Sequence, residues 1–391
     1  MSIEECRCPL QPLTRGPQAH FFGYYDKPPW DGSGRYLLCL EVEETGRMPA
    51  PGEQAIIALV DTSTGRTHPL TRTRAWNWQQ GCMLQWVPGH EHRLVIFNDV
   101  ENEQHVAVIL DIHTGQRRML PRPIYSISPD GRWALSLNLA RLAHARPIVG
   151  YAGIDDPWRD QPHPEDDGVW WMDLGTGDQR LTLSLDAAAR MNPVASMHQV
   201  HHRFEHATIA PDGERFFVLH RLPREGRGRP FFDRLVTAGP DGGDPYLLAG
   251  DELVSHFDWR DGEHILAWAR RGDGGDHFYL MRDRSSEAVI IGAGVLTRDG
   301  HCSYSPDRRW VLTDAYPDTD WRLPVLLYEV DTGRCVQVAS FQTRASLYRR
   351  PGIRCDLHPR WSRDGRQVCV DTPHEGARQM YAIDVSRVVD T

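Results

Sequence analysis

The sequence predicts an all-β fold, a seven-bladed β-propeller with four-stranded antiparallel blades around a central channel. One observation behind this prediction is a turn motif, Ser-Pro-Asp-Gly or a degenerate form of it, that recurs seven times along the 391 residues. A second is the apolar, strand-like run that follows each copy. A repeat of roughly 40–55 residues built from strands and turns is typical of propellers. The copies lie at 30–34, 86–89, 128–131, 210–213, 259–262, 305–307 and 362–365.

Within each repeat we expect an inner strand, the motif turn, a middle strand, and a third strand closed by a second turn. Asp and Gly supply the side-chain hydrogen bonds and positive φ that tight turns need; such turns lie at 61–65, 111–115, 173–177 and 331–333. The third strands carry β-forming residues, at 56–60, 106–110, 325–328 and 380–383. We therefore expect one domain over 1–391, with blades near 20–72, 76–121, 122–185, 200–250, 251–293, 298–342 and 354–388.

Two segments interrupt the repeat. The third blade carries an insertion at 140–168, and an extension at 186–198 follows the same blade. A short helix is expected at 185–191, where three alanines follow one another. Such excursions usually form loops over one mouth of a propeller ring. The sequence shows no linker that would separate two domains.

Composition excludes several function classes. A net charge of −9 argues against a nucleic-acid partner, because phosphate neutralisation needs clustered Lys and Arg. It leaves room for an acidic sugar in a small basic pocket. No apolar run approaches the roughly 18 residues of a membrane helix, and Met1 to Arg15 lacks the apolar core of a signal peptide. We expect a cytoplasmic protein with reduced thiols, Cys39 and Cys369 among them, in strands.

Histidine recurs just before the motif turn, at the expected start of the inner strand. It occupies this position in five of the seven blades, and glutamine occupies it in a sixth. Inner strands line the channel of a propeller, and their starts lie at one face. A structural ring needs small or apolar residues there, so a ring of imidazoles indicates a site.

Three of these histidines predict a metal site. His256, His301 and His358 come from consecutive blades at equivalent registers, and Asp356 shares a strand face with His358. Three imidazoles and a carboxylate suit a divalent ion such as Mn, with Zn or Fe as alternatives. The competing interpretation is that these histidines only bond backbone groups at the blade tops.

A second group of side chains is expected around the same mouth. Histidine exchanges protons near neutral pH, arginine pairs with carboxylates, and tryptophan stacks on sugar rings. The predicted catalytic candidates are His202, His206, Arg221 and Tyr25. The predicted substrate-binding candidates are His20, Tyr24, Asp26, Trp78, Gln79, Gln80 and Arg141. Blade packing for the tryptophan and inter-blade ion pairs for the two arginines are the alternatives.

At these residues the chain resembles the seven-bladed propeller polysaccharide lyases, and the oligogalacturonate lyases in particular. The blade-top histidines 202, 256 and 301 carry the resemblance, together with the Asp-Leu-His-Pro-Arg-Trp-Ser-Arg-Asp-Gly stretch at 356–365. The ulvan lyase propellers and the TolB-like repeats are similar more distantly. The resemblance implies a cytoplasmic enzyme that binds manganese and cleaves uronate sugars by β-elimination. This chain differs in having Asp356 where a ligand histidine is expected and Arg354 in place of a glutamine.

The reaction that the resemblance implies assigns roles to these residues. Neutralising the uronate carboxylate stabilises the enolate that forms when the C5 proton leaves. We expect His202 to be the base, Tyr25 the acid or anchor, and Arg221 the carboxylate clamp.

Other functions remain open at this stage. No P-loop or dinucleotide fingerprint is present, so no nucleotide or organic cofactor is expected. The alternatives are a non-catalytic propeller that binds a protein or glycan, and a glycoside hydrolase that uses carboxylates of 155–156 or 165–167. The sequence does not give the oligomeric state.

Overall fold

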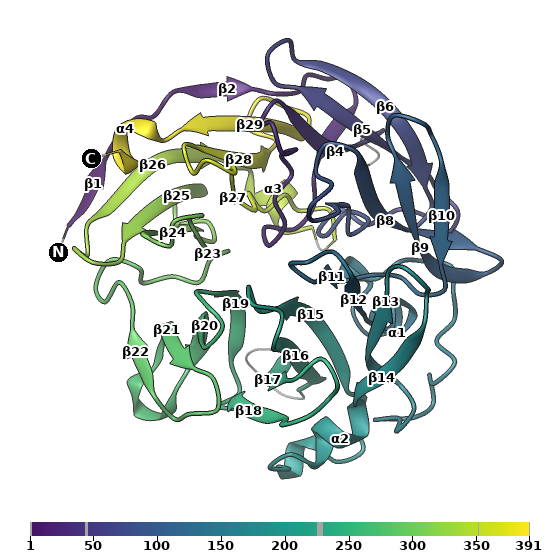
Figure 1. The fold of residues 1–391 in the computed structure, drawn as a ribbon. Coiled ribbons are helices and arrows are strands. Elements are labelled where there is room, and N and C mark those ends of the chain that lie inside the picture. Colours follow the sequence, from purple (N-terminus) through teal and green to yellow (C-terminus); the bar gives the residue numbers. More distant parts are fainter. Residues whose placement is uncertain (1, 44–45, 225–229, 351, 391) are drawn as a thin grey trace.

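Seven antiparallel sheets form a ring around a central channel, so the predicted seven-bladed propeller is confirmed (Figure 1). The structure is a computed structural model that describes residues 2–43, 46–224, 230–350 and 352–390. In the first five blades the first strand in the sequence is innermost and the later strands follow outward, whereas the last two blades add an N-terminal strand at the outer edge. Among the described residues, no helix combines the length and the apolar character that a membrane crossing requires.

The strands of the first four blades follow the chain without exception. Blade one contains β3 (Ala19–Phe21), β4 (Tyr36–Val42), β5 (Ala55–Asp61) and β6 (Arg66–Thr73). Blade two contains β7 (Gln85–Trp86), β8 (Leu94–Glu101), β9 (Gln104–Asp111) and β10 (Arg117–Leu120). Blade three contains β11 (Ser126–Ile127), β12 (Trp133–Ser136), β13 (Gly168–Asp173) and β14 (Gln179–Ser184). Blade four contains β15 (Arg203–Ile209), β16 (Phe216–Pro223), β17 (Phe231–Ala238) and β18 (Tyr246–Ala249).

Blade five again follows the chain, and the last two blades draw strands from both of its ends. Blade five contains β19 (Val254–Trp259), β20 (His264–Arg270), β21 (Asp276–Arg282) and β22 (Ala288–Ile290). Blade six contains β23 (Ser303–Tyr304), β24 (Trp310–Asp314), β25 (Arg322–Glu329), β26 (Cys335–Gln342) and β1 (Ile3–Glu5), which is parallel to β26. Blade seven contains β27 (Arg360–Trp361), β28 (Gln367–Thr372), β29 (Gln379–Asp384) and β2 (Leu10–Pro12).

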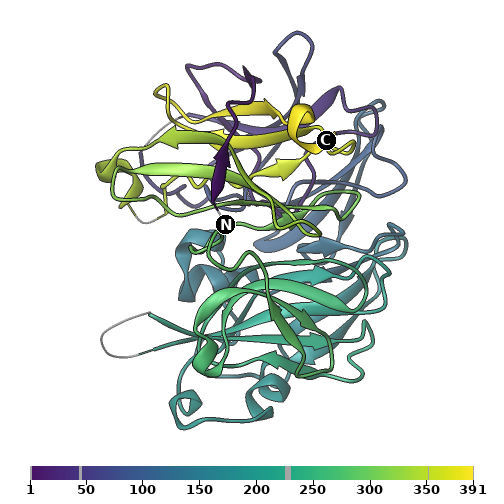
Figure 2. The same cartoon turned by 90° about the vertical axis from the view of Figure 1, so that its left-hand side faces the viewer.

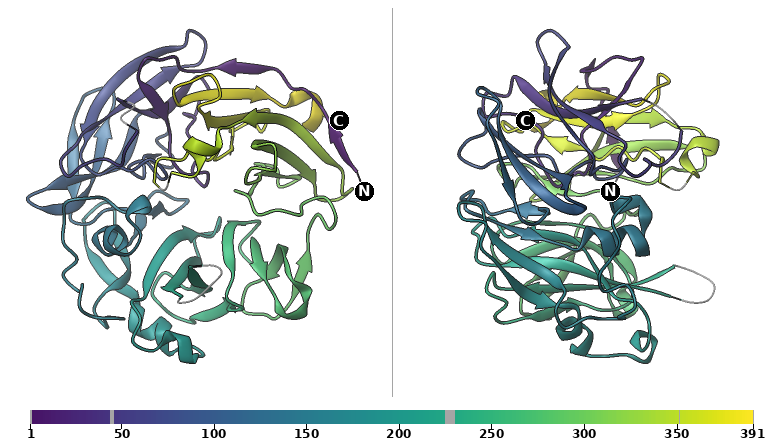
Figure 3. Two further views of the ribbon diagram at one scale, coloured as in Figure 1. Left: turned by 180° about the vertical axis from the view of Figure 1, so that it is seen from behind. Right: turned by 90° about the vertical axis from the view of Figure 1, so that its right-hand side faces the viewer.

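The N-terminal residues, which the repeat left unassigned, therefore close the ring. β2 supplies the outermost strand of the blade that the C-terminal strands begin. The two termini consequently lie near each other at the outer rim (Figures 1 and 3).

The motif turns explain why the repeat is so regular. In the third blade, the hydroxyl of Ser128 donates to the carboxylate of Asp130 at 2.6 Å and accepts from the amide of Trp133 at 3.1 Å. Gly131 takes a φ of 71°, which favours glycine. Packing then joins neighbouring blades: Leu38, Val95 and Cys369 belong to one buried cluster that spans blades one, two and seven.

Helices occur in the excursions and at the chain's C-terminal end. They are α1 (Leu139–Ala145), α2 (Leu185–Arg190), α3 (Ala345–Tyr348), α4 (Ser386–Val389) and the 3₁₀ turns η1 (Pro147–Val149), η2 (Ala195–Met197) and η3 (Gly272–Gly274). α2 confirms the predicted helix after the third blade. The helices α1 and α3 lie beside the channel on the face seen from behind (Figure 3, left), and the side view shows α1 on that face of the ring (Figure 2).

The segment after β3 leaves blade one and enters the channel. Gly23 has a φ of 135°, and a Cβ there would lie 2.8 Å from the carbonyl group of Gln80. Gly81 faces it, and a Cβ on Gly81 would lie 2.7 Å from the carbonyl oxygen of Phe22. Only glycine permits this backbone approach, which places Tyr24 and Tyr25 at the centre of the ring.

Candidate functional site

A cavity of about 300 Å³ lies where the starts of the inner strands meet. Its walls come from the channel segment, from blades two and four to seven, and from the insertion after β12. The polar residues that line it are Tyr24, Gln79, Arg146, His206, Arg221, Ser255, His256, Asp299, His301, Tyr316, Arg354 and Asp356. The structure thus brings together seven of the fifteen residues singled out from the sequence.

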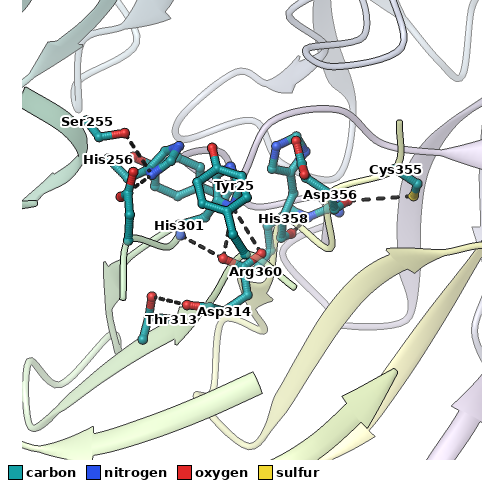
Figure 4. Close-up of polar contacts among 12 residues, drawn as sticks. Tyr25, Ser255, His256, His301, Thr313, Asp314, Cys355, Asp356, His358 and Arg360 are labelled. Carbon is teal, nitrogen blue, oxygen red and sulfur yellow. Dashed lines mark hydrogen bonds and ion pairs between the residues drawn. The ribbon is translucent and has the colours of Figure 1, made fainter. Parts of the chain in front are cut away.

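Three of the four predicted metal ligands form a tight group. One ligand atom each from His301, Asp356 and His358 lies within 4.8 Å of the other two, and all three side chains are buried. The fourth, His256, stands beside them, with its ring centroid 4.0 Å from that of His301 (Figure 4).

The hydrogen bonds of the imidazoles orient nitrogen lone pairs toward this group. His358 donates from Nδ1 to the carbonyl oxygen of Gly23 at 2.8 Å, so its Nε2 carries a lone pair. That Nε2 is buried and has no hydrogen-bond partner among the described residues. Nδ1 of His301 lies 2.9 Å from the carboxylate of Asp314. A carboxylate behind an imidazole is the usual outer partner of a metal-binding histidine.

His256 has the same kind of outer partner. Its Nδ1 lies 2.9 Å from Oδ1 of Asp299, which leaves Nε2 available at the cavity. Burial, and next the neighbouring His301, lower the pKa of His256, so its imidazole is neutral near pH 7. Burial alone would also lower the pKa of His301, but the carboxylates of Asp314, Asp356 and Asp299 together outweigh it and raise that pKa.

Asp356 supplies the negative charge of the group. It accepts from the Tyr348 hydroxyl at 2.7 Å and from Nε of Arg354 at 2.9 Å. Burial would raise the pKa of Asp356, but the Arg354 guanidinium and the imidazole of His301 hold it below its ordinary value. An ionised carboxylate beside the unpartnered Nε2 of His358 fits a divalent cation such as manganese.

A cationic cluster forms the opposite wall. The buried Glu205 carboxylate contacts Arg146 at 2.6 Å, Arg203 at 2.6 Å and Arg221 at 2.8 Å. Arg221 also contacts Asp233 at 2.5 Å. Among the residues that the structure describes, three guanidinium groups thus surround two carboxylates, an excess of one positive charge. Burial opposes ionisation of Glu205, but the arginines, led by Arg146, hold its pKa well below the ordinary value.

His206 reaches the cavity because the backbone bends there. It has a φ of 55°, and the pairing of β15 with β16 shifts register between Glu205 and Thr208. Its ring stacks on Tyr24, with centroids 4.8 Å apart and planes 15° apart. His358 also has a positive φ, 43°. Backbone strain of this kind clusters at functional sites.

Both groups of this stacked pair are neutral. Burial lowers the pKa of the His206 imidazole well below its ordinary value. Burial raises the pKa of the Tyr24 phenol. Nδ1 of His206 lies 3.0 Å from the Tyr125 hydroxyl, and the Gln80 amide nitrogen lies 2.8 Å from the same hydroxyl. Gln80 therefore supports the site from behind and does not line it.

Two predicted residues are placed away from the cavity, which corrects the expectation for them. Nδ1 of His202 lies 2.9 Å from Nε2 of His220, and its Nε2 lies 3.0 Å from the carbonyl oxygen of Met197. Both ring nitrogens of His202 are therefore occupied. Arg141 donates to the Asp156 carboxylate and to four backbone carbonyls, including that of His202, so all its donors hold the insertion in place.

Two further predicted residues have structural contacts instead. Nδ1 and Nε2 of His20 lie 3.0 Å from side-chain oxygens of Gln379 and Glu41 respectively. The indole of Trp78 is buried and donates to the carbonyl oxygen of Arg47, as expected for blade packing.

Tyr25 and Asp26 lie deeper in the channel than the cavity. The Tyr25 hydroxyl donates to the backbone oxygen of Phe257 at 2.9 Å and accepts from its amide at 2.8 Å. Asp26 forms an ion pair with Lys27 at 2.7 Å. Tyr24, and not Tyr25, is thus the tyrosine that faces the cavity.

Sequence reasoning missed several residues of the site. Arg146 lies in the insertion, about 60 positions before the glutamate it contacts, and nothing in its local sequence marks it. Asp299 and Asp314 flank His301 in the chain, so a search for acidic residues near the blade-top histidines finds them. Acidic residues close to a blade-top histidine in the chain are therefore the sequence signal that could have found these two residues.

Comparison with known proteins supports the fold. No family model matches this chain, and no curated protein has a matching sequence. The oligogalacturonate lyase of Vibrio parahaemolyticus aligns over 97% of this chain and 94% of its own, with 14% identity and a TM-score of 0.65. An oligogalacturonate lyase in complex with manganese aligns over 100% of this chain and 98% of its own, with 14% identity and a TM-score of 0.66.

A propeller of different function has a similar shape. The tricorn protease aligns over 96% of this chain and 35% of its own, with 12% identity and a TM-score of 0.53. At 12–14% identity, these structural similarities establish the propeller fold and not the reaction.

Proposed function

We propose that this protein is a lyase that cleaves oligosaccharides containing uronic acids by β-elimination. The observation that carries the proposal is the pairing of two groups in one cavity: a cluster suited to a cation faces a wall with excess positive charge. An anionic substrate is the ligand that such a cavity favours. The similar fold of the oligogalacturonate lyases supports the same reaction class.

His301, His358 and Asp356 would hold a divalent ion, manganese or alternatively zinc or iron. When bound, such an ion neutralises a substrate carboxylate and so acidifies the neighbouring carbon. The remaining groups of the cavity bind the sugar and move its protons.

Arg146 is the cation best placed to bind the substrate carboxylate. Its side chain is 20% exposed, whereas that of Arg221 is only 5% exposed. Arg221 stands behind it, bound to Glu205 and Asp233. The role of clamp that the sequence assigned to Arg221 is therefore shared, with Arg146 in front. Arg354, 29% exposed, flanks the other side of the cavity.

His256 is the group best suited to remove the C5 proton. Its Nδ1 is fixed by Asp299, and its neutral ring presents Nε2 to the cavity. In the elimination, the C5–H bond breaks and the proton passes to His256 Nε2. The electron pair forms the C4–C5 double bond, and the C4–O bond to the departing sugar breaks.

Tyr24 is the group best suited to protonate the departing oxygen. Its phenol keeps its proton because burial raises its pKa, and its ring is held by the stack on His206. The proposed base is thus His256 and not His202, and the proposed acid is Tyr24 and not Tyr25, because neither His202 nor Tyr25 lines the cavity.

A combined measurement tests the proposal. Purified protein is analysed for bound metals and is then incubated with a panel of uronate oligosaccharides and with neutral oligosaccharides of the same length. We expect manganese, zinc or iron near one equivalent, and an ultraviolet absorbance from the new conjugated double bond with uronates only. Tight binding of an oligosaccharide without any absorbance change would instead support a glycan-binding propeller.

A further inference from the structure

A second cavity, of about 370 Å³, lies at the other end of the inner strands. The first cavity is lined by Ser255 and His256 near the start of β19 and by residues that precede β23 and β27, whereas this one is lined by the motif turns that follow β23 and β27. Its lining includes Asp26 and Lys27 of the channel segment, Ser303 and Tyr304 of β23, and Arg360 of β27. The reaction proposed above uses none of them.

The lining of this second cavity contains an unusual number of unpartnered polar atoms. Among the described residues, no hydrogen-bond partner is found for Nη1 of Arg360, the Tyr304 hydroxyl, the Ser303 hydroxyl or Oδ1 of Asp26. All of these atoms are buried. Arg360 is 1% exposed and Tyr304 is 5% exposed.

Arg360 is held so that its guanidinium cannot turn away. Its Nε donates to the carbonyl oxygen of His358 at 2.7 Å, and its Nη2 lies 2.9 Å from a carboxylate oxygen of Asp371. Its Nη1 has no partner among the described residues, and Arg360 is part of the cavity lining. Buried polar groups in folded proteins almost always have partners, so these atoms indicate a ligand or ordered water.

The chemistry of the unpartnered atoms specifies the ligand. Arg360, Tyr304 and Ser303 offer donors, and a fixed guanidinium favours a carboxylate. Oδ1 of Asp26 is an acceptor, which requires a donor on the ligand, and a hydroxyl supplies one. Four cationic side chains line the cavity, those of Lys27, Arg308, Arg360 and Arg363, against two acidic ones, those of Asp26 and Asp258. We propose that this second cavity binds a small hydroxycarboxylic acid, such as a monomeric sugar acid.

The second cavity is separate from the first. Tyr24 lines the first cavity and Tyr25 lines the second, and their ring centroids are 4.6 Å apart. Because both bonds of the Tyr25 hydroxyl go to the backbone of Phe257, this ring is a fixed partition. The inference does not rest on the proposed lyase activity.

Trp361 provides a reporter for the second cavity alone. It lines that cavity, and no tryptophan is among the described residues that line the first. The protein is labelled with 5-fluorotryptophan, and its ¹⁹F resonance is assigned with Trp361→Phe. D-glucuronate is titrated in, with D-glucose and propionate as probes that lack the carboxylate or the hydroxyls. We expect the Trp361 signal to shift saturably with D-glucuronate, and each control probe to bind at least several-fold more weakly.

Matched variants locate the response. Tyr304→Phe removes one unpartnered hydroxyl and should weaken D-glucuronate binding at Trp361 by about 5- to 10-fold. Ser303→Ala offers a second variant if the first does not fold. Arg146→Met, in the first cavity, should leave the Trp361 response unchanged. A Trp361 signal that does not move with D-glucuronate, or one that Arg146→Met abolishes and Tyr304→Phe leaves intact, would overturn the inference.

Discussion

The two walls of the first cavity are built at the tops of propeller blades, but their side chains carry opposite kinds of charge. In blades six and seven, His301 and His358 surround one ionised carboxylate, that of Asp356. At blade four, the guanidiniums of Arg203 and Arg221, with that of Arg146 from the insertion, surround the carboxylates of Glu205 and Asp233. The first wall therefore offers an anionic oxygen and imidazole nitrogens to a cation, whereas the described residues of the second carry more positive than negative charge. The difference shows that blade geometry fixes where side chains meet, while residue type fixes which charge each wall accepts.

The largest expected effect is on turnover, and it tests whether His256 acts as a base or as a metal ligand. His256→Gln removes the proposed base and should lower the rate about 100- to 10,000-fold, while bound metal stays near the wild-type level. The measurement is steady-state turnover together with metal content. His202→Gln is the matched control and should keep its rate, since His202 does not line the cavity. Loss of metal from His256→Gln would make His256 a fourth ligand, as the sequence first indicated.

The cationic wall can be broken by removing its central carboxylate. Glu205→Gln leaves buried guanidiniums uncompensated and should lower the free energy of unfolding by about 3–5 kcal/mol. Chemical denaturation measures this. Glu252→Gln breaks only the exposed ion pair with Arg224 and should cost no more than about 1 kcal/mol. Equal costs for the two variants would contradict the buried network.

Acidification should weaken the protein through histidines that are buried in their neutral form. Burial lowers the pKa of His202 to about 4 from an ordinary value near 6.5. The unfolded chain therefore takes up a proton before the folded chain does, and stability falls as the pH drops from about 6.5 to about 4. The full loss from this one group is about 3 kcal/mol. Denaturation at several pH values measures it, and His202→Gln should show a flatter profile.

The outer carboxylates of the metal-suited wall should have a smaller effect. Asp314→Asn weakens the orientation of His301 and should lower metal affinity about 10- to 100-fold. Titration with manganese, followed by calorimetry, gives the affinity. Asp320→Asn, an exposed residue on the following loop, serves as the control. An unchanged affinity in Asp314→Asn would remove His301 from the ligand set.

The smallest expected effect concerns the cation nearest the substrate. Arg146→Met removes one charge-assisted contact and should raise KM about tenfold, with a smaller change in kcat. Steady-state kinetics on a uronate oligosaccharide measures both constants. Arg190→Met, whose side chain is 70% exposed, is the control. A fall in kcat at constant KM would show that Arg146 acts on the reacting atoms instead.

Much of the fold and part of the site followed from the sequence. The metal-suited residues were found because their register in the repeat is the same in successive blades. His202 and His206 could not be told apart in this way, because they are four positions apart in one segment. The register shift after Glu205 and the positive φ of His206 decide which ring reaches the cavity. Tyr24 and Tyr25 were likewise indistinguishable until the packing of Gly23 against Gly81 fixed their directions.

The sequence by itself determined the seven blades, because each motif turn is closed by bonds within a few residues. It also determined that imidazoles gather at one mouth of the ring, since equivalent registers in a propeller point to the same channel. Only the tertiary structure decided that β2 closes the last blade, that Arg146 of the insertion reaches Glu205, and that a second polar cavity lies below Tyr25. These contacts join residues far apart in the chain, and no local pattern records a partner that only packing brings near.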